Sequence, residues 1–196
     1  MQNINQNDKQ VLREWAIAKR KEVNLEAAAK RLLEQLTLLP EWQSARRVLL
    51  YLAMPDELNV EAILWENAGK AWFVPRCAPK RRLAVHRYVP GETPMHRGPF
   101  GIREPDPAQV AETDPTEMDL VIVPALLYAP NGWRLGHGGG YYDRFLPRLR
   151  PDCVRIGLVP DELIVETLPV DPWDQPVQVV QTPTRHFRAG EGIPGR

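Results

Sequence analysis

The segment Leu120-Val-Ile-Val-Pro124 is apolar throughout, and the glycine-rich segment Asn131-Gly-Trp-Arg-Leu-Gly-His-Gly-Gly-Gly-Tyr-Tyr-Asp-Arg144 follows it. A short, uninterrupted apolar run is typical of a central strand in a parallel sheet, because both faces of such a strand are buried. The apolar character continues over 126–128 towards the glycines, and a helix is expected at about 141–149. The order strand, glycine-rich turn, helix predicts an α/β protein with the glycines at one edge of its sheet.

The rest of the chain predicts the same class. Apolar residues at helical spacing predict helices within 7–36, the second of them over 25–36 and closed by Pro40. Strands are expected at 47–53, 70–75, 83–89 and 154–159, and short helices at 60–68 and 161–166. We therefore expect one domain over 1–196, a parallel sheet with helices on its faces, and a loose tail from about 188. The segment 90–115 is rich in proline, glycine and charge, and it is predicted to be a long loop that is either functional or disordered.

Composition limits the possible functions. Lysine plus arginine and aspartate plus glutamate each number 25, so the formal net charge is zero and the chain has no general attraction for nucleic acid or anionic membranes. Two cysteines, Cys77 and Cys153, are too few for a disulfide framework and are expected to be reduced thiols. The first 21 residues are polar, without the apolar segment of a signal peptide, and no apolar run is long enough to cross a membrane. We expect a cytoplasmic monomer that binds small molecules, with no nucleic-acid or membrane partner.

The glycine-rich turn predicts a phosphate site. Gly136 and the run 138–140 lack Cβ atoms, so the backbone N–H groups can approach an anion closely. Arg134 and His137 lie in the same turn and offer side-chain contacts to phosphate. The pattern is neither a Walker A loop nor a G-x-G-x-x-G fingerprint. Spacing alone leaves a tight turn without a ligand as an equal alternative.

Charged residues elsewhere are candidates for the same site. Asp143 lies one turn into the expected helix, and a carboxylate beside phosphates suits Mg²⁺; Asp174 is a possible second carboxylate. The alternatives are a favourable position near a helix N-terminus for Asp143 and a capping role for Asp174. Lys9 and Arg13 are four residues apart on one helix face, where they either hold phosphate or form a solvated basic face.

Several motifs in order along the chain resemble the 5-formyltetrahydrofolate cyclo-ligase family. The most specific is the core Arg-Leu-Gly-x-Gly-Gly-Gly-Tyr-Tyr-Asp-Arg-x-Leu over 134–146. Other matching segments are Lys9 to Arg13, Met54-Pro-Asp-Glu57, Val74-Pro-Arg76, Gly101-Ile-Arg-Glu-Pro105 and Leu168-Pro-Val with Trp173-Asp-Gln-Pro176. The resemblance spans about 9–183.

The resemblance implies a three-layer α/β/α fold with a mostly parallel central sheet, like that of the sugar-phosphate isomerase and CoA-transferase proteins. It implies ATP- and Mg²⁺-dependent cyclisation of 5-formyltetrahydrofolate to 5,10-methenyltetrahydrofolate, with release of ADP and phosphate, through a phosphorylated formyl group. Arg134 and Tyr141 are implied to be catalytic, Tyr141 lying between the two substrates. Mg²⁺ is implied to be held by Asp143 and Asp174.

The resemblance also implies the two sets of binding residues. Those expected to contact ATP are Lys9, Arg13, Arg134, Leu135, Gly136, His137, Gly138, Gly139, Gly140, Tyr141 and Tyr142. Those expected to contact the folate are Leu52, Glu57, Phe100 and Tyr141. For Glu57 the alternative is an exposed loop acid, and for Phe100 it is a loop anchor packed on the core.

The chain departs from the family pattern at a few positions. His137 stands where arginine is frequent, which would make phosphate contact weaker or pH-sensitive. Ala129 and Gln178 stand where acidic residues are common, and Trp173 where some relatives have histidine. Two other functions remain open: a non-catalytic nucleotide- or folate-binding regulator of the same fold, and a small kinase with another phosphoryl acceptor.

Overall fold

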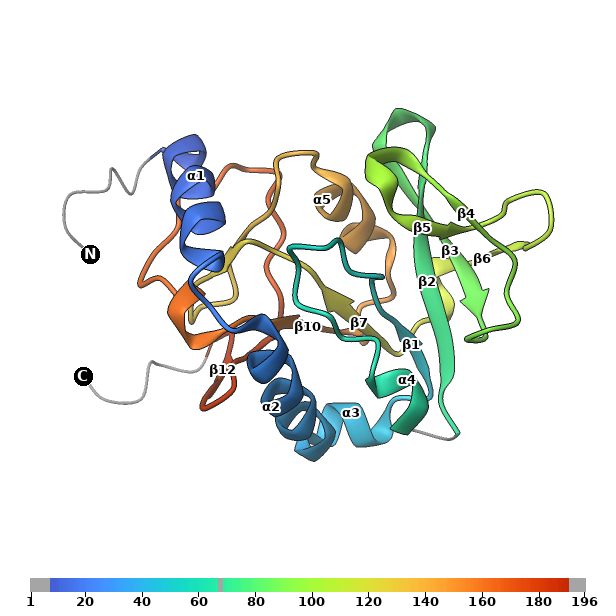
Figure 1. Cartoon of the computed structure of the whole chain (residues 1–196), viewed down its shortest axis with the longest axis horizontal. Coiled ribbons are helices and arrows are strands. Elements are labelled where there is room, and N and C mark those ends of the chain that lie inside the picture. The colour runs from blue at the N-terminus through green and yellow to red at the C-terminus, as the bar shows by residue number, and fades with distance from the viewer. Residues whose placement is uncertain (1–7, 67–68, 191–196) are drawn as a thin grey trace.

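One eight-stranded sheet forms the centre of the molecule. Its strands are β1 (Arg47–Leu49), β2 (Ala71–Ala78), β3 (Arg82–Tyr88), β6 (Glu112–Thr113), β7 (Leu120–Val123), β10 (Val154–Leu158), β11 (Val179–Gln181) and β12 (His186–Arg188). The computed structural model describes residues 8–66 and 69–190. The strand order is β12-β11-β10-β7-β1-β2-β3-β6, and every pairing from β11 to β2 is parallel (Figure 1). The predicted mostly parallel sheet is confirmed.

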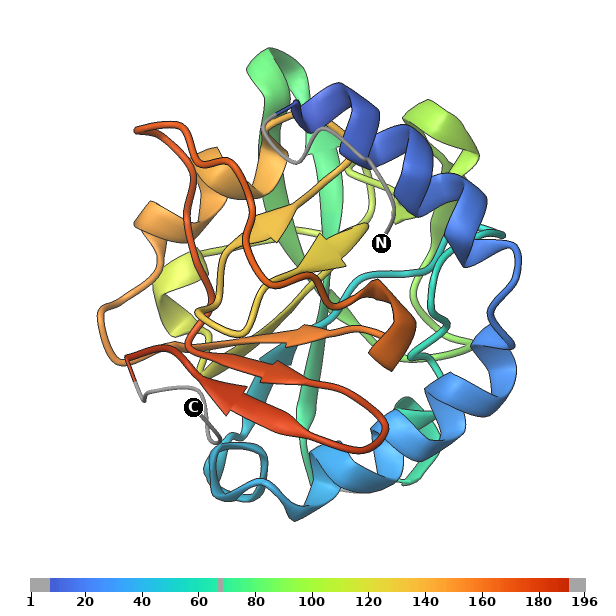
Figure 2. The same ribbon diagram turned by 90° about the vertical axis from the view of Figure 1, so that its left-hand side faces the viewer.

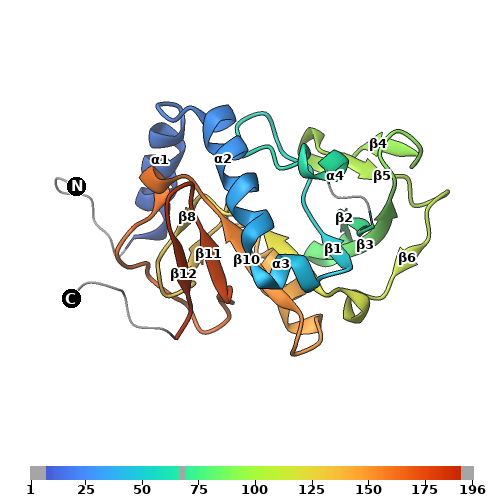
Figure 3. The ribbon, with the colours of Figure 1, turned by 90° about the horizontal axis from the view of Figure 1, so that it is seen from below.

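Helices cover both faces of this sheet. The helices are α1 (Lys9–Arg20), α2 (Leu25–Leu38), α3 (Pro40–Ser44), α4 (Ile63–Glu66) and α5 (Tyr141–Phe145). α1 and α5 lie on one side, and α2, α3 and α4 on the other (Figures 1 and 3). Neighbouring strand residues point to opposite faces, so Val48 packs in the core under α2 while Leu49 packs in the core under α1. The three-layer α/β/α architecture is therefore confirmed.

A buried arginine near the end of helix α1 attaches this helix to the loops at one edge of the sheet. Asp8 caps the helix by accepting from the N–H of Gln10 at 2.8 Å. At the other end, Arg20 is only 6% exposed and donates to the carbonyl oxygens of Ala125 at 2.8 Å and Asp56 at 3.3 Å. Those two carbonyls lie in the loops that follow β7 and β1. The Arg20 bonds thus tie α1 to the carboxyl ends of the parallel strands (Figure 2).

Several predicted helices differ in length from those observed. α2 continues to Leu38, and Pro40 begins α3 instead of only closing α2. The helix expected at 60–68 is only the four residues of α4, and positions 67–68 lie outside the described residues. The helix expected at 141–149 stops at Phe145 and continues as a 3-10 turn, where Pro147 has no N–H to donate. The one at 161–166 is a single 3-10 turn.

The prediction of an irregular loop over 90–115 is wrong. β4 (Met95–Arg97) and β5 (Arg103–Pro105) form an antiparallel hairpin within it, and β6 pairs with β3 as the edge strand of the large sheet (Figure 3). The hairpin was missed because its strands are three residues long and carry arginine, histidine and proline instead of an apolar alternation.

The ends of two predicted strands differ more from the structure than their starts do. β1 ends at Leu49 instead of 53, and β2 continues to Ala78 instead of 75. The loose tail was also expected to begin too early, at 188, because Arg188 belongs to β12 and pairs with Val179 in β11. Positions 191–196 lie outside the described residues. None of the helices in 8–66 and 69–190 is long and apolar enough to cross a membrane.

A close approach between two strands defines the middle of the core. Tyr128 is fully buried, and its hydroxyl donates to the carbonyl oxygen of Val123 at 2.7 Å. Its ring lies against Gly157 in β10, where an added Cβ would be 2.3 Å from the ring carbon Cζ. Only a residue without a side chain therefore fits at position 157 while Tyr128 keeps its place.

We expect Gly157→Ala to destabilise the protein by about 1–3 kcal/mol, because the new methyl group overpacks a rigid core. Thermal unfolding of the variant, compared with the wild type, measures this loss. The double variant Gly157→Ala/Tyr128→Leu should lose less than the sum of the two single changes, since the smaller side chain makes room. A fully additive double variant would show that Tyr128 is not the obstacle.

Candidate active site

A cavity of about 520 Å³ opens at the carboxyl ends of β1 and β7 and along β2. Carboxyl ends of parallel strands meet at one edge, and ligands of open α/β sheets bind there. Every residue that was predicted from the sequence to bind a ligand or metal, and whose side chain the structure describes, lines this cavity. Phe100 lies in a 3-10 turn of the β4–β5 hairpin, and its side chain is outside the described part of the structure.

The glycine-rich turn forms one wall of the cavity. β8 (Leu127–Tyr128) and β9 (Arg134–Leu135) form a small ladder that carries the chain into the turn. Gly138 and Gly140 have φ angles of +96° and +66°, which residues with side chains rarely adopt. Arg13 donates from Nε to the carbonyl oxygen of Gly136 at 3.0 Å. This hydrogen bond connects α1 to the turn.

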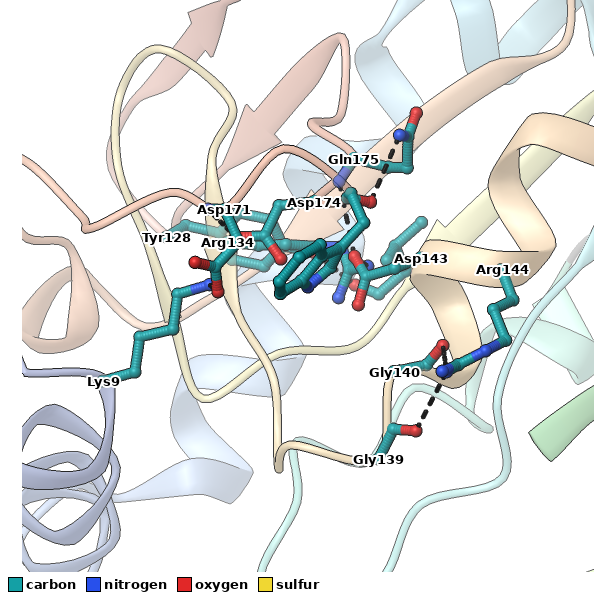
Figure 4. A network of polar contacts seen from close by, with 12 residues as sticks. Lys9, Tyr128, Arg134, Gly139, Gly140, Asp143, Arg144, Asp171, Asp174 and Gln175 are labelled. Carbon is teal, nitrogen blue, oxygen red and sulfur yellow. Dashed lines mark hydrogen bonds and ion pairs between the residues drawn. The ribbon is translucent and has the colours of Figure 1, made fainter.

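The helix after the turn contributes less than the sequence predicts. α5 has five residues instead of the nine we expected, so its dipole is weaker than that of the expected helix. Arg144 donates to the carbonyl oxygen of Gly140 at 2.8 Å and so stabilises the turn from its far side (Figure 4). Any anion held here would depend mainly on the N–H groups of the turn and on nearby cations.

Arg134 and Asp143 form a charge pair inside the cavity wall. Nη2 of Arg134 lies 2.6 Å from Oδ1 of Asp143, and the arginine side chain is 5% exposed (Figure 4). The same carboxylate oxygen accepts from the N–H of Gln175 at 3.3 Å. Nε of Arg134 is buried and has no hydrogen-bond partner among the described residues. A buried arginine with an unused donor is suited to gripping an anionic ligand.

Lys9 forms a second charged group on the same wall. Its Nζ lies 2.6 Å from Oδ2 of Asp171 and 2.5 Å from Oδ2 of Asp174 (Figure 4). Burial would lower the pKa of Lys9, but the hydrogen bonds to the two carboxylates outweigh it and raise the pKa. The prediction named Asp174 and missed Asp171, although both belong to the same Asp-Pro-Trp-Asp sequence.

Glu57 and Leu52 lie in the loop that follows β1. The Glu57 side chain is 10% exposed, which excludes the alternative of an exposed loop acid. Its Oε2 accepts from the N–H of Met54 at 3.1 Å, and its Oε1 lies 3.3 Å from Nε2 of His137. His137 therefore connects the glycine-rich turn to Glu57 within the cavity wall.

The hairpin supplies a wall that the sequence did not predict. Glu104 in β5 is 2% exposed, and its Oε1 accepts from the N–H of Cys77 at 2.8 Å. The other oxygen packs against Gly98, where an added Cβ would be 2.0 Å from it. Glu104 therefore locks the hairpin onto β2. The only signal for it in the sequence is weak, a glutamate inside a segment predicted to be a loop.

A family model described as the 5-formyltetrahydrofolate cyclo-ligase family matches residues 5–183 of this chain. The chain belongs to this family of enzymes. The 5-formyltetrahydrofolate cyclo-ligase of Haemophilus influenzae is 34% identical over 146 residues, covering 71% of this chain and 76% of that protein. The Escherichia coli K12 cyclo-ligase is 32% identical over 149 residues, covering 72% and 80%.

Solved structures agree with the cyclo-ligase assignment. The 5,10-methenyltetrahydrofolate synthetase of Aquifex aeolicus superposes with a TM-score of 0.80 at 28% identity, over 96% of each chain. The Mycoplasma pneumoniae synthetase superposes with a TM-score of 0.70 at 18% identity, which supports the fold alone. The resemblance seen in the sequence motifs is confirmed.

The cavity of this cyclo-ligase family member also contains a thiol that its surroundings keep protonated. Burial, followed by the hydrogen bond with Glu104, raises the pKa of Cys77 to about 12. Burial likewise raises the pKa of Cys153 to about 11. An ordinary cysteine has a pKa of about 8.5, so neither group is a ready nucleophile at neutral pH.

We expect Cys77 to resist iodoacetamide at pH 8 in the folded protein, although it lines the cavity, because the thiolate is the reactive form. Alkylation of a Cys153→Ala variant, followed by mass spectrometry from pH 7 to 10.5, isolates Cys77. The rate should rise throughout this range without levelling off, while the unfolded chain reacts readily. A plateau reached near pH 9 in the folded protein would contradict the raised pKa.

Proposed function

We propose that this chain catalyses the cyclisation of 5-formyltetrahydrofolate to 5,10-methenyltetrahydrofolate, using ATP and releasing ADP and phosphate. The observation that carries the proposal is that one cavity brings together the glycine-rich turn, two charge pairs and the buried Glu57. Family membership and the folate chemistry named in the relatives support it. We further propose that the protein is a cytoplasmic monomer that acts on small molecules and has no nucleic-acid or membrane partner.

The nucleotide is proposed to bind where basic side chains lie next to the glycine-rich turn. The triphosphate would accept hydrogen bonds from the turn N–H groups and from Arg134, Arg13 and Lys9. Arg134 has a buried donor, Nε, without a partner among the described residues, and the other two side chains reach this wall from α1. The cations of this wall are already paired with carboxylates or a carbonyl, so phosphate binding exchanges partners instead of burying new unpaired charge.

A divalent cation fits this wall. Asp143, Asp171 and Asp174 line it, and their charges would repel a triphosphate unless a cation lay between them. Within the described residues, no cluster of three or more histidine, cysteine, aspartate or glutamate side chains could hold a metal alone. Mg²⁺ commonly binds through one or two carboxylates together with phosphate oxygens and water. Asp143 and Asp174 would hold it, and it would neutralise charge on the phosphates.

The folate is proposed to bind next to Glu57. A carboxylate held in place can accept paired N–H bonds from the edge of a pterin ring, and the apolar Leu52 beside it would pack against the ring. Phe100 is proposed as a stacking partner from the hairpin. Tyr141 lines the cavity at the start of α5, next to the glycines, and is proposed to contact both substrates.

The reaction then needs alignment more than protein nucleophiles. The formyl oxygen attacks the γ-phosphorus and the bond to ADP breaks, which converts a poor leaving group into a phosphate ester. The neighbouring folate amine attacks the activated carbon, loses its proton, and phosphate departs with the original formyl oxygen. The chain contributes by holding oxygen and phosphorus in line and by stabilising charge through Arg134 and the turn N–H groups. Neither cysteine is needed, in agreement with their raised pKa values.

The test is the appearance of the methenyl product's absorbance with purified protein, 5-formyltetrahydrofolate, ATP and Mg²⁺, with each component omitted in turn. The proposal expects the band only in the complete mixture. ATP consumption without 5-formyltetrahydrofolate would favour a kinase with another acceptor. Binding of ATP or folate without any turnover would favour the regulatory alternative.

Asp143→Asn should raise the Mg²⁺ concentration needed for half-maximal turnover by at least about tenfold. The asparagine keeps an oxygen for Arg134 and Gln175, so thermal stability should change little. Asp152→Asn is the matched control, because Asp152 is an exposed aspartate outside the cavity. An Asp143→Asn enzyme that turned over normally at limiting Mg²⁺ would remove this residue from the metal site.

A further inference from the structure

Trp173 is an exposed indole at a charged cavity. Its exposed fraction is 66%, and it lines the same cavity as the glycine-rich turn. The structure describes five other large apolar side chains as exposed, and none of them lines the cavity: Val11, Ile17, Leu38, Trp65 and Val170. When a flat ring covers a tryptophan face that was exposed to water, the free energy falls because apolar surface is buried.

The backbone that carries Trp173 is fixed on its N-terminal side. Residues 171–174 form a turn in which the N–H of Asp174 donates to the carbonyl oxygen of Asp171 at 3.0 Å. The N–H of Asp171 donates in return to Oδ2 of Asp174 at 2.9 Å. Lys9 binds both carboxylates, so α1 clamps the turn (Figure 4). The indole is therefore presented on a rigid support.

The C-terminal side of the turn is fixed as well. Gln175 donates from its N–H to Oδ1 of Asp143 at 3.3 Å and from Nε2 to the carbonyl oxygen of Trp173 at 3.3 Å (Figure 4). Asp143 is in turn paired with Arg134. Trp173 thus stands between the two charged groups proposed to hold phosphates and Mg²⁺. The carboxylate of Glu57, in contrast, accepts its hydrogen bond from the N–H of Met54, which lies outside the turn 171–174.

We infer that Trp173 stacks on the base of the bound nucleoside triphosphate, an inference that rests on the proposed nucleotide site. The cations of the wall would hold the phosphates, and the indole face would cover the heteroaromatic ring at the cavity mouth. Stacking tolerates any base because every base has a π face. Trp173 is therefore assigned a role in nucleotide affinity and no role in contacting the phosphates.

Binding measurements separate a contact with the base from a contact with the phosphates. Calorimetric titration of wild type and Trp173→Ala with ATP and with inorganic tripolyphosphate, both with Mg²⁺, compares a ligand that has a base with one that has none. We expect Trp173→Ala to raise the Kd for ATP by about 5- to 100-fold. The Kd for tripolyphosphate should stay within about twofold, and Trp173→Phe should keep most of the ATP affinity.

Trp65→Ala is the matched control. Trp65 is 74% exposed, lies on α4 and is outside the cavity, so its loss should leave both Kd values unchanged. ATP should also quench tryptophan fluorescence in the wild type and in Trp65→Phe but much less in Trp173→Phe.

Several results would overturn the inference. Equal weakening of ATP and tripolyphosphate in Trp173→Ala would mean that the residue only positions the charged turn. A raised KM for 5-formyltetrahydrofolate with an unchanged Kd for ATP would place the indole against the folate. Unchanged ATP binding would remove the contact altogether. A wild-type protein that bound neither ATP nor tripolyphosphate would instead overturn the proposed function, and the inference with it.

Discussion

The parallel pairing of β1 with both β2 and β7 is the constraint on which the site depends. Because the strands run in one direction, their carboxyl ends share one edge, and the chain must leave the sheet there through loops. The loop after β1 carries Leu52 and Glu57, and the segment after β7 leads into the glycine-rich turn. Two segments about 80 residues apart in the sequence, by the numbering of Glu57 and His137, therefore face each other across one cavity.

Charge pairing then organises the edge. Helix α1 is tied down by the buried Arg20, and it places Arg13 on the carbonyl of Gly136. Its first residue, Lys9, reaches the turn 171–174, and Arg134 reaches Asp143. The chain has no net charge, so the proposed anion affinity at this edge would come from local geometry and not from an overall positive potential. Each cation already has a carboxylate or carbonyl partner, whose place a phosphate would take.

The sequence predicted the fold class and most of the residues that line the cavity, because both depend on local patterns. Apolar runs such as 120–123 are determined by burial, and the motif around Gly136 is long enough to be specific. Positions that depend on contacts between distant segments were missed. Glu104 is a site residue only because β5 packs on β2, and Asp171 only because α1 brings Lys9 to it.

The ends of elements were predicted less well for a related reason. The strand run at 47–53 is apolar beyond Leu49, so periodicity alone could not show where pairing stops and the site loop begins. His137 shows the same limit, since its contact with Glu57 joins two loops that are distant in sequence. Local propensity identifies elements, but tertiary packing decides their lengths and their neighbours.

The most direct test of the proposed chemistry follows the formyl oxygen. The substrate would be 5-formyltetrahydrofolate labelled with ¹⁸O in its formyl group, turned over with unlabelled ATP and Mg²⁺ in ordinary water, and the released phosphate would be analysed by mass spectrometry. Attack of the formyl oxygen on the γ-phosphorus predicts one ¹⁸O atom in each phosphate formed. Phosphate without the label, released together with the methenyl product, would contradict the account, because ATP would then be hydrolysed by water instead of activating the formyl group.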